Sequence, residues 1–417
     1  MKSWLRPSVP TLDGVGVIPR IFDSASQGLV EARPADSSPG VASIYVCGIT
    51  PYDATHLGHA ATYLAFDTLI RLWLDCGFEV RYVQNSTDVD DPLLERAIRD
   101  GLDWRELAQS QTDLFRSDME RLRIIPPTRY VAVTEVIPAV AEAVERLGRS
   151  GHAYRVSSID AQDDLYFDSS AVLPVWKLGD ESSLTRDAML VLSAERGGDP
   201  DRKGKRDPLD PLLWRSERPG EPAWDSVLGR GRPGWHIECS VIAIAELPTP
   251  ITVNGGGRDL VFPHHEFSAG HAAALTGHSL AGIYSHAGLV AYKGQKMSKS
   301  LGNLVLVSRL TAAGVDPRAI RLALACQHYR SDWEWTDALL ATAAARLSSW
   351  VEWAAVGDEV GTVVDPSLAV LSAIRLRMAD DLDTAGAVKL IDAAIRDLVP
   401  ASRLLVDAID ALLGIRL

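Results

Sequence analysis

The chain has 417 residues, of which 47% are hydrophobic, so it is long enough for two or three domains with a substantial buried core. Its 42 Lys and Arg residues against 55 Asp and Glu residues leave a formal net charge of −13, which repels nucleic acids unless a local basic patch opposes it. No apolar run reaches the roughly 18 residues of a membrane span, and the N-terminus lacks the apolar stretch of a signal peptide, so we expect a cytoplasmic protein.

The first part of the chain alternates between strand and helix patterns. Residues 1–40 are rich in Pro, Gly and Ser and predict an extended lead-in. Apolar runs at 43–47 and 79–84 predict strands, and helical spacing of apolar residues predicts helices at 57–76 and from Pro92. This order predicts a parallel α/β sheet with right-handed crossovers.

The pattern then changes twice. Residues 126–235 contain the proline pair Pro126-Pro127 and a long stretch rich in Gly, Pro and charge from Glu195 to Arg232, which predicts an inserted connective region. The strand pattern returns at 251–254 and continues to a glycine-containing loop at 294–299. After Pro317, Ala, Leu, Arg and Asp recur at helical spacing and predict a C-terminal helical bundle.

The sequence HLGH at 56–59 lies just after a predicted strand and opens a predicted helix. Gly58 would let a phosphate approach the backbone, where the helix N-terminus supplies unpaired N–H groups and a positive dipole end. His56 and His59 could then donate hydrogen bonds to phosphate oxygens. Taken alone, such a motif is more often explained by a histidine that caps the helix.

The sequence KMSKS at 296–300 lies in a loop that contains glycines. Lys296 and Lys299 would place cations where negative charge grows on a departing pyrophosphate, which stabilises the transition state more than the ground state. A lysine-rich loop alone is usually a solvated turn. Together with HLGH about 240 residues upstream, it indicates nucleotide chemistry.

Four cysteines in so long a chain do not form a disulfide framework, and the open question is which of them bind metal. Cys47 at a strand end, Cys239 in a predicted helix and His264 after a glycine-rich loop are donors suited to tetrahedral Zn²⁺. Dispersed single residues are weak evidence, because a buried cysteine is more often a small core residue. Cys76 and Cys326 sit in apolar helical runs and are interpreted as core.

Three other motif matches are discounted. The G-x-G-x-x-G match at 229–234 follows no predicted strand and contains a proline. The His-Glu pair at 265–266 would need a second histidine at Ala269 to resemble a zinc-protease helix. The acidic run at 88–91 is more simply interpreted as N-terminal capping of the following helix than as a cation site.

With these motifs the chain resembles the class I aminoacyl-tRNA synthetases, and more narrowly the cysteinyl-tRNA synthetases, over residues 44–303. The matching stretches stand in the family's order and are CGITPYD (47–53), NSTDVDD (85–91), GRPGWHIECS (231–240) and GGRDLVFPHHE (256–266). The resemblance implies a Rossmann-like parallel sheet of the class I synthetase (HUP) type with an inserted connective region and a C-terminal helical bundle. The expected divisions are the first half of the Rossmann domain (1–125), the connective insertion (126–235), the second half with the KMSKS loop (236–303), and the helical stem and bundle (304–417).

The resemblance also implies a site. It assigns zinc ligands to Cys47, Cys239 and His264, whereas the family's fourth ligand, a Glu, falls on Ser268. Three protein ligands leave a position open for an incoming cysteine thiolate. Asp259 suits a ribose hydroxyl, because a carboxylate can accept hydrogen bonds. The residues implied to line the cysteinyl-adenylate site are Cys47, Gly48, Ile49, Thr50, Thr62, Asn85, Ser86, Thr87, Trp235, Gly257, Arg258, Asp259 and Val290.

Some features depart from the synthetase pattern. Residues 336–417 carry 7 Lys and Arg against 12 Asp and Glu, an acidic balance that suits tRNA binding poorly. We also expect this short helical segment to leave no room for an anticodon-reading domain. Ala61 and Pro92 replace an Arg and a Lys of that pattern. The segment ERGGDP at 195–200 instead resembles the mycothiol-pathway ligases that join cysteine to the amine of glucosaminyl-inositol, a family with a short C-terminus and a three-ligand zinc.

We therefore expect a ligase that forms cysteinyl-AMP from L-cysteine and ATP and transfers cysteine to glucosaminyl-inositol, releasing AMP and pyrophosphate. We expect one Zn²⁺ per chain, Mg²⁺ with ATP, a monomer, and neither nucleic acid nor membrane as a partner. The alternatives are a truncated cysteinyl-tRNA synthetase with a separate tRNA-binding partner and a catalytically silent synthetase-like binding protein. Intact HLGH and KMSKS argue against the silent alternative.

Overall fold

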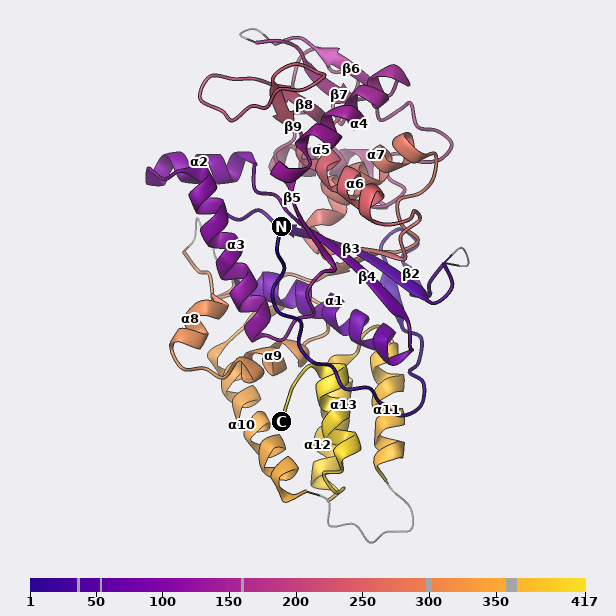
Figure 1. Ribbon diagram of the computed structural model, residues 1–417, viewed down its shortest axis with the longest axis vertical. Coiled ribbons are helices and arrows are strands. Elements are labelled where there is room, and N and C mark those ends of the chain that lie inside the picture. Colours follow the sequence, from indigo (N-terminus) through magenta and orange to yellow (C-terminus); the bar gives the residue numbers. More distant parts are fainter. Residues whose placement is uncertain (36–37, 53–54, 159–160, 298–301, 358–365) are drawn as a thin grey trace.

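The computed structural model describes residues 1–417 except 36–37, 53–54, 159–160, 298–301 and 358–365. Its centre is a parallel sheet of five strands among the described residues (Figure 1). These are β3 (Val41–Ile49), β4 (Glu79–Ser86), β5 (Arg129–Ala132), β10 (Val253–Gly257) and β11 (Tyr284–Ala287). They lie in the order β11-β10-β3-β4-β5, and every pairing is parallel, so the predicted sheet type is confirmed.

The central strand β3 separates two hydrophobic cores. Helix α1 (Leu57–Asp75) connects β3 to β4 and packs in the core that contains Ile44 and Val46. Tyr45 and Cys47 point to the opposite face, into the core built by α6 (Trp235–Glu246) and α7 (Glu266–Thr276). Because successive strand residues point to opposite faces, this alternation alone brings the Cys47 side chain to the side of α6 and α7.

The insertion forms its own antiparallel sheet in the order β6-β7-β8-β9. Its elements are α4 (Ile137–Arg149), β6 (Ala153–Val156), β7 (Asp164–Phe167), α5 (Arg186–Glu195), β8 (Leu212–Ser216) and β9 (Gly231–Pro233). Helices α2 (Asp91–Asp100) and α3 (Trp104–Arg121) connect β4 to β5. The central sheet extends past the expected boundary at residue 125, because β5 pairs with β4. Sequence analysis did not predict this strand, since it is only four residues long and follows a proline pair.

The N-terminal lead-in is more structured than expected, because β1 (Arg20–Asp23) and β2 (Gly28–Glu31) form an antiparallel hairpin. After β11 come β12 (Val290–Tyr292), β13 (Gln295–Lys296), α8 (Val307–Ala312), α9 (Pro317–Ala325) and β14 (Trp333–Trp335). Helices α10 (Asp337–Val356), α11 (Ser367–Ala379), α12 (Thr384–Arg396) and α13 (Arg403–Leu413) then confirm the C-terminal helical region. Within the described residues, none of the helices combines the length and apolar character needed to cross a bilayer.

A buried ion cluster attaches the C-terminal helices to α1. Asp67 and Arg71 on α1 have no exposed side-chain surface, and Arg71 Nε donates to Asp67 Oδ2 at 2.8 Å. Arg321 on α9 also donates to Asp67 and reaches the carbonyl of Leu413 at 2.6 Å. The shared carboxylate therefore holds α1, α9 and the end of α13 together, since a lone buried charge would be strongly unfavourable.

Candidate functional site

A cavity of about 200 Å³ lies at the carboxyl ends of β3, β4 and β10 and at the start of α1. This is the position at which open α/β sheets bind their ligands. The expected residues that line it are Cys47, Gly48, Ile49, Thr50, His59, Thr62, Asn85, Thr87, Trp235, Cys239, Gly257, Asp259, His264 and Val290. Residues scattered over more than 240 positions of sequence are thus brought to one space.

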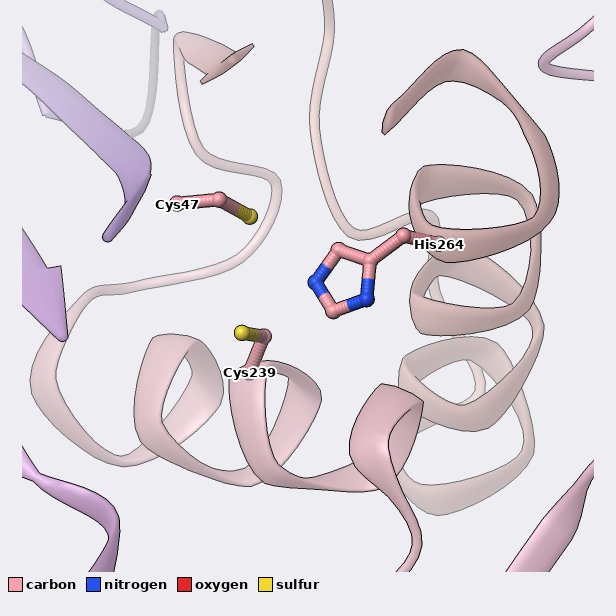
Figure 2. Close-up of side chains that lie close together, drawn as sticks. All are labelled: Cys47, Cys239 and His264. Carbon is pink, nitrogen blue, oxygen red and sulfur yellow. The ribbon is translucent and has the colours of Figure 1, made fainter. Parts of the chain in front are cut away.

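Three buried side chains with metal-binding atoms meet at one wall of this cavity. Figure 2 shows both sulfur atoms and one ring nitrogen of His264 directed toward a common space between β3, α6 and the segment before α7. The donor atoms of Cys47, Cys239 and His264 all lie within 4.8 Å of one another. Tetrahedral zinc with its usual bond lengths would hold such donors roughly 3.5–3.8 Å apart, so a small contraction completes the geometry.

Ser268, at the position expected for a fourth ligand, is turned away from these donors. Its Oγ donates to the carbonyl of His236 at 3.2 Å, and its own carbonyl accepts from Ser240 at 3.0 Å. Among the described residues, the group of possible metal ligands at this site is limited to Cys47, Cys239 and His264. Two sulfurs, one imidazole and an open position facing a cavity fit a zinc site that admits a substrate atom.

The pKa values of the two cysteine thiols are shifted in opposite directions. Hydrogen bonding with Cys47 lowers the pKa of the Cys239 thiol well below its usual value, and nearby His264 lowers it further. Burial and the hydrogen bond with Cys239 raise the pKa of Cys47 well above its usual value. Cys239 is therefore the sulfur of the pair that loses its proton more readily, and the thiolate is the form that binds a metal ion.

A row of hydrogen-bonded buried imidazoles leads away from the Cys47 sulfur. Cys47 Sγ lies 3.2 Å from His265 Nε2, His265 Nδ1 lies 2.8 Å from His286 Nε2, and His286 Nδ1 lies 2.7 Å from Ser24 Oγ. Burial lowers the pKa of His265 and brings that of His286 down to about 3, so both rings are neutral at pH 7. Sequence analysis missed this row, because its members come from the turn after β1, from β11 and from the segment before α7.

The end of β3 is shaped by a close backbone approach. A side chain at Gly48 would place its Cβ 1.5 Å from the carbonyl oxygen of Asn85, so glycine is required there. Asn85 Oδ1 accepts from the Gly48 amide at 2.8 Å and from the Tyr45 hydroxyl at 3.0 Å. The register of β3 against β4 shifts between Val46 and Ile49, which exposes this turn to the cavity.

Two of the residues expected to line the adenylate site, Ser86 and Arg258, do not line the cavity, and His56 is also absent from its lining. Ser86 is fully buried and points to the other face of β4, since strand residues alternate and Asn85 and Thr87 occupy the cavity side. The Arg258 side chain is exposed and turned outward, where its guanidinium pairs with Asp332 at 2.8 Å. Sequence spacing could not reveal either orientation, because both residues sit inside matching motifs.

Gly58, expected at the phosphate end, also lines the cavity, and the structure adds residues that sequence analysis did not assign to the site: Tyr52, Tyr63, Leu260, Gly288 and Leu289. Tyr63 lies on α1 and donates its hydroxyl to the carbonyl of Cys47 at 3.1 Å. Its position six residues into the helix carried no motif signal. Apolar helical spacing made it look like an ordinary core residue, which is also true of its ring.

The HLGH motif opens α1 as predicted, and His56 is its N-cap. His56 Nδ1 accepts a hydrogen bond from the Gly58 amide at 3.1 Å, so the helix-capping interpretation holds for this residue. The His59 ring stacks on it at 3.9 Å and lines the cavity. Capping through Nδ1 leaves Nε2 of His56 as the N–H donor, so capping and phosphate binding are compatible in one imidazole.

The KMSKS segment is only partly described. Lys296 ends β13, which pairs with β12 and places Lys296 opposite Ala291. Val290, at the start of β12, lines the cavity, so the hairpin that leads into KMSKS begins at the site. Lys299 lies outside the described residues.

Comparisons with known proteins agree with this arrangement. The family model for the tRNA synthetases class I (C) catalytic domain matches residues 35–345. An L-cysteine:1D-myo-inositol 2-amino-2-deoxy-alpha-D-glucopyranoside ligase of Clavibacter michiganensis subsp. michiganensis is 61% identical, over 100% of this chain and 99% of that protein. A ligase of the same name from Kineococcus radiotolerans is 56% identical, over 94% and 92%.

Among solved structures, methionyl-tRNA synthetase of Mycobacterium tuberculosis in complex with methionyl-adenylate superposes with a TM-score of 0.60. The match covers 86% of this chain and 82% of that one at 17% sequence identity. At this identity the likeness extends to the fold alone. It agrees with the parallel sheet and with the helical C-terminal region seen here.

Proposed function

The chain belongs to the class I cysteinyl-tRNA synthetase-like family and, within it, to the L-cysteine:1D-myo-inositol 2-amino-2-deoxy-alpha-D-glucopyranoside ligases, and we propose that it performs the reaction this name describes. It is an ATP-dependent ligase that forms an amide between the carboxyl group of L-cysteine and the amine of glucosaminyl-inositol, a step of mycothiol biosynthesis. The observation that carries this proposal is the position of Cys47, Cys239 and His264 on the wall of the cavity that also receives the start of α1.

The three donors suit selection of cysteine over serine. Zinc held by Cys47, Cys239 and His264 would bind the thiolate of the substrate, because metal coordination stabilises a thiolate at neutral pH and leaves a serine hydroxyl protonated. Pocket shape alone would separate the two amino acids only weakly, since they differ by one atom and nearly match in size. The buried donors would thus allow the site to distinguish a thiol from a hydroxyl, which an apolar wall could not do.

The rest of the cavity suits adenylation. His56 and His59 donate to the phosphates of ATP at the start of α1, Asp259 accepts from a ribose hydroxyl, and Lys296 and Lys299 stabilise charge on the leaving pyrophosphate. The cysteine carboxylate attacks the α-phosphorus, giving cysteinyl-AMP and pyrophosphate, with Mg²⁺ accompanying ATP. The acceptor amine then attacks the activated carbonyl, and the C–O bond to AMP breaks as the amide forms.

We further propose that the protein acts as a cytoplasmic monomer on small-molecule substrates, without nucleic acid or membrane partners. The net charge of −13 supports the exclusion of nucleic acid, since polyanions are repelled on average. The four cysteines, none of them in a disulfide, support a reducing compartment.

The decisive experiment supplies ATP and cysteine together with either glucosaminyl-inositol or tRNA and measures AMP release. We expect release that depends on the amino sugar and does not respond to tRNA. Cysteine-dependent ATP–pyrophosphate exchange, measured in parallel, reports adenylation alone. Efficient tRNA charging would overturn the choice of acceptor, and absence of exchange would overturn the enzymatic function.

A further inference from the structure

A second and larger cavity, of about 750 Å³, adjoins the first. Its walls come from α2, α5, β8 and β9, which Figure 1 shows around the junction of the central sheet and the insertion. Its volume lies within the roughly 300–1,000 Å³ of pockets that bind small organic ligands. Five residues line both cavities: Thr50, Tyr52, Trp235, Asp259 and Leu260.

The shared wall places the second cavity beside the reacting carbonyl. In the first cavity, the donors Cys47, Cys239 and His264 mark the side-chain end of the bound amino acid, and His59 marks the phosphate end. The mixed anhydride of cysteinyl-AMP would therefore lie between these ends. A nucleophile bound in the second cavity, next to the five residues that line both cavities, would approach that carbonyl.

The segment 195–200, whose role the sequence left open, forms part of the second cavity. Arg196 holds it against the first cavity, since its Nη1 donates to the carbonyls of Asp259, at 2.5 Å, and Phe262. A Cβ at Gly198 would approach Ser193 Oγ to 2.2 Å, so the turn after α5 depends on glycine there. The wall is therefore anchored to the loop that carries Asp259.

The cationic side chains around this cavity are already engaged. Arg215 forms two 2.8 Å hydrogen bonds to Glu221, which also accepts from Arg232 at 3.3 Å. Arg232 also pairs with Asp91. The remaining two ion pairs are Arg202 with Asp164 at 2.7 Å and Lys205 with Asp199 at 3.0 Å. All four of these cationic side chains are therefore already in ion pairs and are not available to bind an anionic ligand.

Besides Asp210, which the neutral donors Tyr154 and Ser169 hold, three carboxylates on the same walls form no ion pair within the described residues: Asp90, Glu95 and Glu195. Asp90 is the least solvated of them, and Glu95 and Glu195 are exposed. Asp90 Oδ1 caps α2 by accepting from the Asp91 amide at 2.8 Å, whereas no partner is recorded for its Oδ2 within the described structure. Burial raises the pKa of Asp90 to about 6, because the Asp91 amide and the charge of Arg232 offset the loss of solvent only in part.

We propose that this second cavity binds the amino-sugar acceptor and that Asp90 holds the acceptor's ammonium group beside the activated carbonyl. The ammonium group releases a proton to solvent before its nitrogen attacks, so Asp90 acts by positioning that nitrogen. The inference rests on the proposed function and adds to it the acceptor site and the residue that positions the nucleophilic nitrogen. A partly desolvated carboxylate and an ammonium group form a charge-assisted hydrogen bond, which is shorter and stronger than a neutral one. Tyr52 and Trp235 on the shared wall supply ring surface for the sugar.

The test variant is Asp90→Asn, because asparagine caps helices as well as aspartate and the change removes only the charge. Its matched control is Asp103→Asn, which makes the same change at the N-cap of α3, outside both cavities. We expect the KM for the amino sugar to rise about 10–100-fold in Asp90→Asn, the range for a hydrogen bond to a charged group, with ATP–pyrophosphate exchange unchanged. Asp103→Asn should match the wild type in both assays.

A ligand that carries a hydroxyl in place of the amine separates recognition of charge from damage to the cavity. As a competitive inhibitor, this analogue should bind the wild type and Asp90→Asn equally, whereas the amino sugar loses affinity only in the variant. Equal loss for both ligands, or an unchanged KM for the amino sugar, would overturn the role of Asp90. A wild-type enzyme that performs exchange but never uses the amino sugar would instead overturn the proposed function.

Discussion

The Nδ1 atom of His264 lies 3.1 Å from the Nδ1 atom of His236, which leaves Nε2 of His264 to face the sulfurs of Cys47 and Cys239 (Figure 2). Both His236 and Cys239 lie on α6, three residues apart and therefore on one face of the helix. One helix thus supplies a sulfur of the candidate metal site and the group that lies against its histidine. Burial lowers the pKa of His236 well below its usual value, so its neutral ring can accept a hydrogen bond from an Nδ1–H group of His264.

Replacing His236 with Phe should weaken zinc binding about 10–100-fold, because residues that orient a metal-binding histidine commonly contribute that much affinity. Zinc affinity is measured by competition with a coloured chelator, independently of activity. His278→Phe, at an exposed histidine, is the matched control. If both variants hold zinc as tightly as the wild type, His236 does not orient His264.

Changing Cys239 to Ala should raise the KM for cysteine sharply and leave ATP binding nearly intact. Loss of one metal-binding sulfur would remove the zinc ion, to which a serine hydroxyl binds poorly. The preference for cysteine over serine, of about 10⁴ or more, should be lost with it. Pyrophosphate exchange with cysteine and with serine measures both effects, and circular dichroism checks the fold. Cys76→Ala, at a half-buried cysteine on the far end of α1, should change neither; full preference for cysteine in a folded, zinc-free enzyme would contradict the metal's role.

Replacing Lys296 with Ala should slow adenylation about 10²–10³-fold, the range for loss of one preorganised electrostatic donor. Transfer from preformed cysteinyl-AMP should be much less affected, because pyrophosphate has already left. Rapid-quench measurement of each half-reaction separates the two effects. Lys293→Ala, which removes an exposed lysine beside the same hairpin, serves as the control, and equal damage to both half-reactions would indicate a structural role instead.

Replacing Asp67 with Asn should lower the free energy of unfolding by about 3–5 kcal/mol, because Arg71 and Arg321 would remain buried without their shared carboxylate. Burial opposes ionisation of Asp67, but the two guanidinium groups outweigh it and lower its pKa. The folded-state pKa is therefore below the unfolded value of about 3.9, so this stabilisation is present above about pH 4 and is lost as the pH falls further.

Urea unfolding at pH 7 and below pH 4 measures this difference, and we expect the gap between wild type and Asp67→Asn to narrow in acid. Asp407→Asn is the control, because its partner Arg403 is 93% exposed and such pairs contribute about 0–1 kcal/mol. A gap that stays constant with pH would mean that the Asp67 charge does not stabilise the fold.

Strand and helix order was predictable because the local pattern is strong. Residues 43–47 and 57–76 carry apolar spacing that only a buried strand and an amphipathic helix satisfy, and both elements form there. Strand β5 and the β1–β2 hairpin were not predicted, since four-residue strands acquire their pairing from neighbours distant in sequence. The same holds for His265 and His286, whose row exists only after β11 packs beside β10.

By itself the sequence determined the order of the elements and the chemistry available, since HLGH, KMSKS and the cysteine and histidine donors are readable as residue types at set spacings. Only the tertiary structure decided which of these atoms face one another. Strand alternation sends Asn85 into the cavity and Ser86 away from it, and the α6 face brings Cys239 to Cys47 across almost 200 residues. The charge of the second cavity was likewise invisible in the sequence, because only the structure shows that Arg215 and Arg232 form their ion pairs with Glu221 and Asp91 and not with Asp90.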